Sequence, residues 1–211
     1  MRKIFIDGGA NIGQSTKTFL SQWPNSSEYE IYMFEPISNI ELKNLTSKND
    51  NIKLFKKAVW TTDKQVTFYI KNKTSQGNTI IKEKANISSA NHEEKIVDCI
   101  SLSNFIKENF NVDDEIILKL DIECAEYEVL KDIVQKDSIK YINILFCEIH
   151  GLKCGKKYEE TLELVQLCSD QGVMPYIWDA DKFKYKTYKE RVYNKKRIDF
   201  EYNKWKKRGL K

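Results

Sequence analysis

The sequence lacks the features that mark several common protein classes. It has no C-x-x-C pair, and its five cysteines form an odd set, so we expect neither a zinc cluster nor a disulfide framework. No apolar run approaches the roughly 20 residues that a membrane-spanning helix needs, and neither repeats nor low-complexity tracts occur. We therefore expect a globular protein without a membrane span. Its cysteines, expected to be mostly small buried hydrophobic residues, are Cys99, Cys124, Cys147, Cys154 and Cys168.

Length and charge limit the architecture further. A chain of 211 residues, of which 41% are hydrophobic, suits one well-buried domain. The first apolar run begins so close to Met1 that we expect no signal peptide and a cytoplasmic protein. The net charge of +4 is unevenly spread, because residues 181–211 carry thirteen lysines or arginines against four acidic residues. That segment is expected to meet an anion, a polar polymer or a surface.

A glycine-rich turn follows the first apolar run of the chain. Gly8, Gly9 and Gly13 allow the backbone torsions and close approaches that an immediate turn from strand to helix requires. The next apolar run, residues 31–34, ends at Glu35, where an acidic residue accepts hydrogen bonds from ribose hydroxyls in nucleoside-binding proteins. The two features predict a nucleoside-binding α/β domain, and a tight turn without a ligand is the simpler alternative.

The spacing of the glycine loop favours one kind of cofactor. Asp7, Gly9 and Gly13 fit the D-x-G-x-x-x-G pattern of methyltransferases that use S-adenosylmethionine. The dinucleotide fingerprint G-x-G-x-x-G fits less well, because Ala10 or Asn11 would have to replace its second glycine. S-adenosylmethionine has no pyrophosphate, so a phosphate cradle at the helix start is not required. An NAD-dependent oxidoreductase is therefore the least favoured alternative.

Acidic side chains follow two further apolar runs. Residues 115–120 have a buried-strand pattern and lead into Asp121 and Glu123. A second run near residues 142–149 leads to Glu148 and then to His150. Ligands of open parallel sheets bind beyond the carboxyl ends of the strands, so we expect these four side chains to converge on one cleft rim.

The remaining patterns alternate between strand and helix, which predicts an α/β fold with a mostly parallel sheet. Phe183 and Tyr185 alternate with lysines, which predicts a last strand and a C-terminal antiparallel hairpin. The polar residues 71–94 are interpreted either as a loop that closes over the site or as a disordered linker. Further helices are expected at 12–23, shortly after Pro36, at 102–110 and at 158–170, and further strands at 52–59, 65–70, 95–100 and 173–178.

Four sequence blocks together resemble one known family. They are IDGGANIG at residues 6–13, FEP at 34–36, LKLDIECAE at 118–126 and FCEIH at 146–150. In this order and spacing the chain resembles the FkbM family of methyltransferases over residues 3–178. Cys124 stands where such proteins commonly have glycine.

The resemblance implies a class I methyltransferase (Rossmann-like) fold, S-adenosylmethionine as the cofactor and methyl transfer to an oxygen. The acceptor it implies is a hydroxyl of a sugar, a glycan or a small metabolite. We expect residues 1–180 to form the S-adenosylmethionine-binding domain. Residues 181–211 lie outside the resemblance and are expected to form a basic, aromatic C-terminal extension of the same domain. The residues assigned to cofactor binding are Asp7, Gly8, Gly9, Asn11, Gly13, Ser15, Glu35 and Asp121.

Transfer to a neutral hydroxyl requires a group that orients the hydroxyl and removes its proton. Histidine is the usual general base because its pKa lies nearest neutrality. Asp121 and His150 are therefore the first choices for catalytic residues, and Lys119 is a third. A structural role for His150, which would satisfy a hydrogen bond at the strand end, is the alternative.

The same acidic side chains also suggest a metal site. Asp121, Glu148 and His150, with Glu123 nearby, are interpreted as ligands of a Mg²⁺ ion that lowers the pKa of the acceptor hydroxyl. Pairing within a structural network is the simpler interpretation of clustered carboxylates. Glu126 is expected only to begin the following helix, where negative charge is favoured.

The basic C-terminal segment raises a second possible acceptor. Aromatic faces stack on sugars and on nucleobases, and cations contact phosphate, so the segment is interpreted as part of an acceptor groove. A solvated edge and helix is the alternative. An RNA ribose 2′-O-methyltransferase is thus a competing function, and a non-catalytic nucleoside-binding protein is another. The aromatic residues concerned are Phe183, Tyr185, Tyr188, Tyr193, Phe200, Tyr202 and Trp205.

Overall fold

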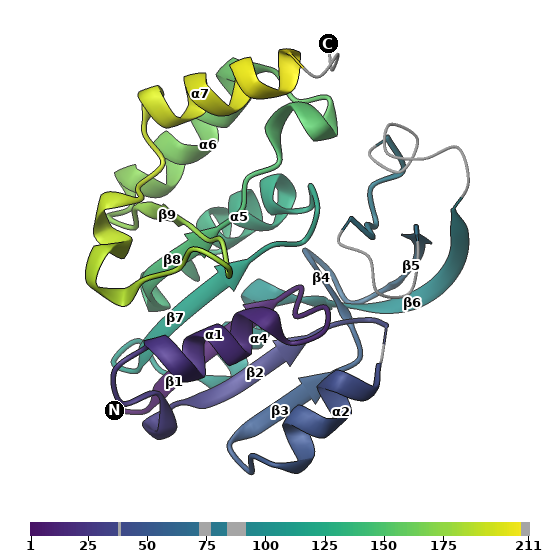
Figure 1. Ribbon diagram of the computed structural model, residues 1–211, viewed down its shortest axis with the longest axis vertical. Helices are drawn as coiled ribbons and strands as arrows, with labels where there is room; N and C mark the ends of the chain where they lie inside the picture. Colours follow the sequence, from purple (N-terminus) through teal and green to yellow (C-terminus); the bar gives the residue numbers. More distant parts are fainter. Residues whose placement is uncertain (38, 72–76, 84–91, 208–211) are drawn as a thin grey trace.

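The chain folds into an α/β structure whose main sheet is parallel (Figure 1). The computed structural model describes residues 1–37, 39–71, 77–83 and 92–207, and six of its strands pair in the order β3-β2-β1-β7-β8-β9. The predicted fold class with a mostly parallel sheet is confirmed. The order reverses between β1 and β7, and ligands of open α/β sheets bind at such a switch point. The strands are β1 (Lys3–Gly8), β2 (Glu30–Phe34), β3 (Ile52–Phe55), β7 (Glu115–Leu120), β8 (Ile142–Cys147) and β9 (Pro175–Ile177).

A smaller sheet lies beside the main one (Figure 1). Its strands are β4 (Ala58–Trp60), which runs parallel to β6 (Glu93–Ser101), and β5 (Gln65–Ile70), which runs antiparallel to β6. The pattern at residues 52–59 predicts one strand, but the structure divides it into β3 and β4, which belong to different sheets. The polar pair Lys56 and Lys57 lies at the break between them.

Helices cover both faces of the main sheet. None of those in the described part of the chain has the length and the apolar character needed to cross a membrane. The α-helices are α1 (Gln14–Gln22), α2 (Ile40–Ser47), α4 (Leu102–Asn109), α5 (Glu126–Gln135), α6 (Tyr158–Asp170) and α7 (Lys195–Lys206). The short 3₁₀ helices are η1 (Ser26–Glu28), η2 (Ile139–Tyr141), η3 (Gly151–Cys154) and η4 (Tyr185–Glu190).

Side chains of β1 alternate between two hydrophobic clusters. Ile4 and Ile6 pack into the cluster that contains Leu130 of α5, on one face of the sheet. Phe5 points to the other face, where its ring stacks on Phe19 of α1 with centroids 4.0 Å apart. A strand covered on both faces must be apolar at successive positions, which explains the continuous run in the sequence.

The last strand predicted at Phe183 and Tyr185 does not form, and the antiparallel pairing of the C-terminal segment with β9 is a single bridge at Val192. Residues 185–190 form η4, and β9 pairs parallel with β8. With three residues per turn, a 3₁₀ helix places Tyr185 and Tyr188 on one side, and both rings contact Trp23. Aromatic packing thus outweighs the period-two pattern. One isolated antiparallel bridge, between Tyr176 and Val192, is recorded here.

The expectation of no disulfide is also wrong, because Cys124 and Cys154 are bonded. Their Cα atoms lie 5.6 Å apart although 30 positions separate them in the sequence. The fold brings the turn between β7 and α5 next to η3, and no local motif signals this contact. The other three cysteines, Cys99, Cys147 and Cys168, are buried and free, as expected.

The loop predicted at residues 71–94 is described in part. Residues 72–76 and 84–91 lie outside the described residues. Thr79, in the described part, forms backbone hydrogen bonds with Tyr69, and its Oγ1 donates to the carbonyl oxygen of Glu123 at 2.6 Å. These contacts attach the segment to the turn that follows β7.

Candidate active site

Two adjoining pockets open at the carboxyl ends of β1, β2, β7 and β8. The first, which we call the inner pocket, has an apolar lining that includes Phe34, Ile37, Val59 and Phe68, with Glu35 among its polar groups. The second, the outer cleft, has a volume of about 750 Å³ and is lined by residues that include Ser15, Glu148, His150 and Trp178. The wall common to both consists of Gly9, Asn11, Gly77, Asp121 and Glu123.

The backbone of the glycine loop, at Gly8 and Gly9, packs closely against the turn that follows β7. Gly9 has a φ of 79°, and a Cβ atom at this position would lie 2.0 Å from the carbonyl oxygen of Asp121. At Gly8 a Cβ would lie 2.8 Å from the Leu120 side chain, and Gly13, the N-cap of α1, has a φ of 83°. Only glycine permits this close approach, which is the physical reason for the motif.

Replacement of Gly9 by alanine is expected to lower the free energy of unfolding by at least about 3 kcal/mol, because the backbone must move away from Asp121. Gly172 provides a matched control, since it has the same φ of 79° but no atom within 4 Å of a Cβ. Gly172→Ala should cost only the roughly 1–2 kcal/mol of a left-handed alanine. Urea denaturation measures both, and equal losses would show that the contact with Asp121 is unimportant.

Asp7 and Lys119 lie beneath the glycine loop and outside the lining of both pockets. Lys119 Nζ is 3.0 Å from Asp7 Oδ1 and donates to the carbonyl oxygens of Gly8 and Gly9 at 3.3 and 2.9 Å. Thr16 Oγ1 donates to the other carboxylate oxygen of Asp7. Burial lowers the pKa of Lys119, but Asp7, Asp121 and Glu148 together outweigh that effect and raise the pKa above its ordinary value. The lysine is thus a buried cation that holds the glycine loop. Its predicted catalytic role would require a position in one of the pockets, and Lys119 lines neither.

Glu35 lies at the base of the inner pocket. Its two oxygens accept hydrogen bonds from the backbone N–H groups of Asn11 and Ile37, both at 3.0 Å. Burial raises the pKa of Glu35 to about 7, although these two N–H groups oppose the shift. Each carboxylate oxygen has a second lone pair, so Glu35 retains capacity to accept hydrogen bonds from a ligand.

The outer cleft begins at α1 and extends toward the C-terminal segment. Ser15 lines it, and the Ser15 hydroxyl accepts a hydrogen bond from Trp178 Nε1 at 3.0 Å. Tyr193 and Phe200 line its far side, and Phe200 remains 58% exposed. Three other aromatic residues of the segment, Phe183, Tyr188 and Tyr202, are buried and line neither pocket, so only part of the predicted aromatic groove exists.

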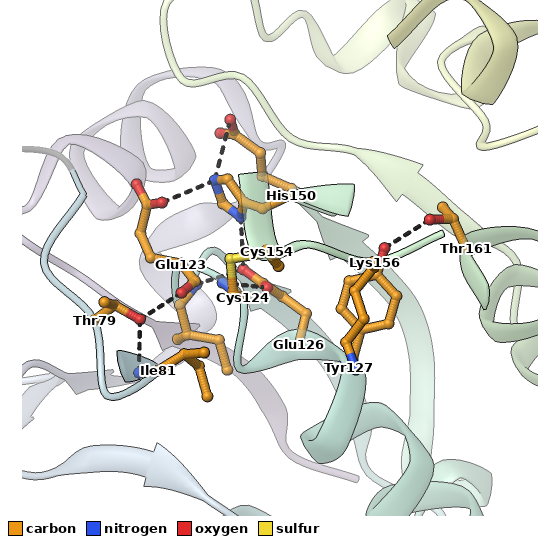
Figure 2. The surroundings of a disulfide bond; sticks show 12 residues. Thr79, Ile81, Glu123, Cys124, Glu126, Tyr127, His150, Cys154, Lys156 and Thr161 are labelled. Carbon is orange, nitrogen blue, oxygen red and sulfur yellow. Dashed lines mark hydrogen bonds and ion pairs between the residues drawn. A yellow bond between two sulfur atoms is a disulfide. The ribbon is translucent and has the colours of Figure 1, made fainter. Parts of the chain in front are cut away.

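Glu126 organises the acidic turn after β7. It is fully buried, and its carboxylate accepts hydrogen bonds from the backbone N–H groups of Ile122 and Cys124 at 2.9 and 2.8 Å. Glu126 Oε1 also lies 3.0 Å from His150 Nδ1 (Figure 2). The sequence predicts only a helix-start role for Glu126. Its place as the last acidic residue of the LKLDIECAE block at 118–126 is the sequence signal that indicates a role in the site as well.

His150 is surrounded by carboxylates. Its Nε2 lies 3.3 Å from Glu123 Oε2, 3.5 Å from Glu148 Oε1 and 3.8 Å from Asp121 Oδ1. Burial alone lowers the pKa of His150, but Glu123 and Glu126 outweigh it and raise the pKa to about 10. The imidazole is therefore protonated at neutral pH and cannot accept a proton there, which conflicts with the predicted role as general base.

Asp121, like Glu35, is a carboxylate whose ionisation falls near neutrality, and it lies in the wall common to both pockets. Burial raises its pKa to about 7, against the opposing effect of Lys119. Glu148 raises the pKa further, and His150 lowers it. A carboxylate of this kind changes between acid and base close to pH 7, as a general base requires.

The charge on His150 predicts a pH dependence of stability. The pKa of His150 in the folded protein, about 10, exceeds the roughly 6.5 of an unfolded chain, so its stabilising effect is complete below pH 6.5 and is lost as the pH rises toward 10. Relative to His150→Gln, the wild type should lose at least about 2 kcal/mol between pH 6 and pH 9. Denaturation at both pH values measures this. A constant difference would show that folding leaves the pKa of His150 unchanged.

The proposed Mg²⁺ ligands are close together, but the compact set differs from the predicted one. Ligand atoms of Asp121, Glu123 and His150 lie within 4.8 Å of one another, whereas Glu148 is at the more exposed edge. His150 would have to lose its proton before it could bind a metal ion, and its pKa of about 10 opposes that loss. Binding of a Mg²⁺ ion at this set would therefore have to displace the proton on His150.

The parallel sheet, the glycine loop at its switch point and the acidic end of β2 define a protein of the class I methyltransferase (Rossmann-like) fold. The family model described as the methyltransferase FkbM domain matches residues 7–173, and the chain belongs to this methyltransferase family. The resemblance of the four sequence blocks to that family is thereby confirmed.

A similar solved structure is methyltransferase FkbM from Methylobacillus flagellatus, at 17% identity and a TM-score of 0.39. That match covers 65% of this chain and 30% of the other chain. A comparison with curated proteins finds no match.

Proposed function

We propose that the protein is an S-adenosylmethionine-dependent O-methyltransferase that acts on a hydroxyl of a sugar, a glycan or a small metabolite. The observation that carries this proposal is the position of Asp121 in the wall between the inner pocket and the outer cleft. A carboxylate with a pKa of about 7 thus faces both the pocket of a nucleoside and the space for an acceptor.

The inner pocket fits the nucleoside part of the cofactor. Its apolar walls suit an adenine ring, and Glu35 suits the two ribose hydroxyls. Gly9 and Asn11 lie where the glycine loop would contact the ligand, and Ser15 would meet the part that extends into the outer cleft. When bound, S-adenosylmethionine supplies an electrophilic methyl group on a sulfonium.

The acceptor hydroxyl must lose a proton as it attacks. Asp121 removes that proton in our proposal, and the protonated His150 holds Glu123 and Glu148 in place and balances their charge. Lys119 acts through the loop as a positioning residue, because its ammonium contacts the carbonyl oxygens of Gly8 and Gly9. Asp7 in turn holds Lys119.

The C-terminal segment supplies the acceptor wall. Tyr193, Arg197, Phe200 and Lys204 of this segment line the outer cleft, together with Trp178, which lies just before it. All five residues lie beyond the family match, which ends at residue 173. The exposed ring of Phe200, with the Arg197 guanidinium 5.5 Å from its centroid, offers a face on which a sugar can stack. We therefore propose that residues 1–180 and 181–211 form one functional domain.

Two alternatives predict different acceptors or cofactors. An RNA ribose 2′-O-methyltransferase would use the lysines of the C-terminal segment, yet Lys182 and Arg197 at the cleft pair with Asp179 and Glu201. A Mg²⁺ ion at Asp121, Glu148 and His150 would replace the proton on His150.

A methyl-transfer assay tests the proposal. The protein is incubated with labelled S-adenosylmethionine and panels of sugars, small hydroxylated metabolites and short RNAs, with and without EDTA. We expect label in a sugar or metabolite, unaffected by EDTA. Label in RNA alone, with strong salt dependence, would establish the nucleic-acid alternative, because phosphate contacts release counterions. Loss of transfer with EDTA would establish the metal.

A further inference from the structure

The disulfide joins the two loops that carry the candidate catalytic side chains. Cys124 follows Asp121 and Glu123 in the turn after β7, and Cys154 ends η3, which begins directly after His150. Figure 2 shows the bond beside Glu123, Glu126 and His150. The covalent link thus lies directly beneath the wall that separates the two pockets.

The turn after β7 adopts a backbone conformation that residues other than glycine rarely adopt. Glu123 has a φ of 52° and Cys124 a φ of 88°, so two consecutive residues occupy the left-handed region. Such residues persist only when their surroundings hold them. Here the contacts are the hydrogen bond from Cys124 N to Glu126, the hydrogen bond from Thr79 Oγ1 to the Glu123 carbonyl oxygen, and the disulfide.

The bond also fixes the relative position of the two loops. Glu123 and Asp121 on one loop interact with His150 on the other at 3.3 and 3.8 Å. Without the link, the turn can relax toward right-handed torsions, which would shift both carboxylates in the wall of the inner pocket. Glycine at position 124 would have no such tendency, because it accepts positive φ without cost.

We propose that the Cys124–Cys154 disulfide holds the turn that forms the wall of the inner pocket at Asp121 and Glu123, so that cofactor binding and activity depend on the thiol–disulfide state of this pair. This inference rests on the proposed function. Reduction needs a dithiol: one of its thiolates attacks a cysteine sulfur and displaces the other cysteine as a thiolate. The second thiol of the reductant then releases the first cysteine. Two electrons pass to the protein, two cysteine thiols form, and the reductant leaves as a disulfide.

The consequence is a redox-dependent enzyme. Both sulfurs are buried, with Cys124 3% and Cys154 8% exposed, so exchange requires opening of the turn. Glutathione disulfide is the class of oxidant that restores the bond, with release of two glutathione thiols. In a compartment where thiols are kept reduced the turn would be relaxed, and in an oxidising one it would be locked.

The test measures binding of S-adenosylhomocysteine by calorimetry to the oxidised protein and to the protein after dithiothreitol. Thiol titration in denaturant should count three thiols before reduction and five after it, since Cys99, Cys147 and Cys168 are free but buried in the folded protein. We expect reduction, Cys154→Ser and Cys124→Ser each to weaken binding by about tenfold. A loss of this size is within the conformational cost of holding two residues with side chains in the left-handed region. Cys168→Ser, which alters a free buried cysteine, is the matched control and should bind as the wild type does.

Cys124→Gly separates positioning from simple crosslinking. This variant lacks the disulfide, but glycine accommodates the φ of 88° at position 124. Its affinity for S-adenosylhomocysteine should therefore lie within about twofold of that of the oxidised wild type and should not change with dithiothreitol. A reduced wild type that binds as tightly as the oxidised one would overturn the inference, as would a Cys124→Gly variant as weak as Cys124→Ser. Absence of binding to the oxidised wild type would instead count against the proposed function itself.

Discussion

Replacement of Asp121 by asparagine is expected to slow methyl transfer about a thousandfold, within the range measured for general acid–base residues. Asparagine keeps the shape of the side chain in the wall between the pockets but cannot accept a proton from the acceptor. Binding of S-adenosylhomocysteine should change by less than about threefold, because proton removal occurs only in the transition state. The assay compares kcat and the dissociation constant of the variant and the wild type.

The wild-type rate should also rise with pH through about 7, since burial raises the pKa of Asp121 to that value and only the deprotonated carboxylate acts as a base. Glu128→Gln is the matched control, because Glu128 lies in the first turn of α5, shortly after Asp121, is 47% exposed and lies outside both pockets. A similar loss of rate in both variants, or an unchanged rate in Asp121→Asn, would assign proton removal to another group.

Replacement of Glu35 by alanine is expected to weaken binding of S-adenosylmethionine at least about a hundredfold, because two ribose hydroxyls lose charge-assisted hydrogen bonds of about 1.5–3 kcal/mol each. The backbone N–H groups of Asn11 and Ile37 would lose their acceptor as well. Since burial raises the pKa of Glu35 to about 7, wild-type affinity should increase from pH 6 to pH 8 as the carboxylate ionises.

Glu108→Gln removes an exposed carboxylate from α4, away from both pockets, and controls for the change in net charge. It should leave the affinity and its pH dependence unchanged. If Glu35→Ala bound the cofactor as tightly as Glu108→Gln, the inner pocket would not be the nucleoside site.

Several elements of the fold follow from local sequence patterns. The apolar runs of β1, β2, β7 and β8 predict a sheet buried on both faces, and the glycines after β1 predict the tight turn that the 2.0 Å approach at Gly9 explains. These signals are local, because strand burial and glycine torsions depend on neighbouring residues. The carboxyl ends of parallel strands meet at one edge, so the proximity of Asp121 and His150 was also predictable.

Other features depend on contacts between distant residues. The charge on His150 arises from carboxylates of the turn between β7 and α5, more than 20 residues earlier in the chain, and an isolated histidine in the sequence predicts a neutral side chain. The disulfide depends on the packing of the β7–α5 turn against η3, which no cysteine spacing reveals. The C-terminal segment forms η4 because its tyrosines pack on Trp23, although the alternation of its residues favours a strand.

The most direct test of this account is a calorimetric titration of the oxidised wild-type protein with S-adenosylmethionine and with S-adenosylhomocysteine. The arrangement of Glu35, Gly9 and Asp121 predicts saturable binding of both ligands, with one site per chain. We expect dissociation constants in the micromolar range, which correspond to a binding free energy on the order of −8 kcal/mol. Absence of heat and of any thermal stabilisation by either ligand, in a protein that unfolds cooperatively, would contradict the assignment of the inner pocket to the cofactor.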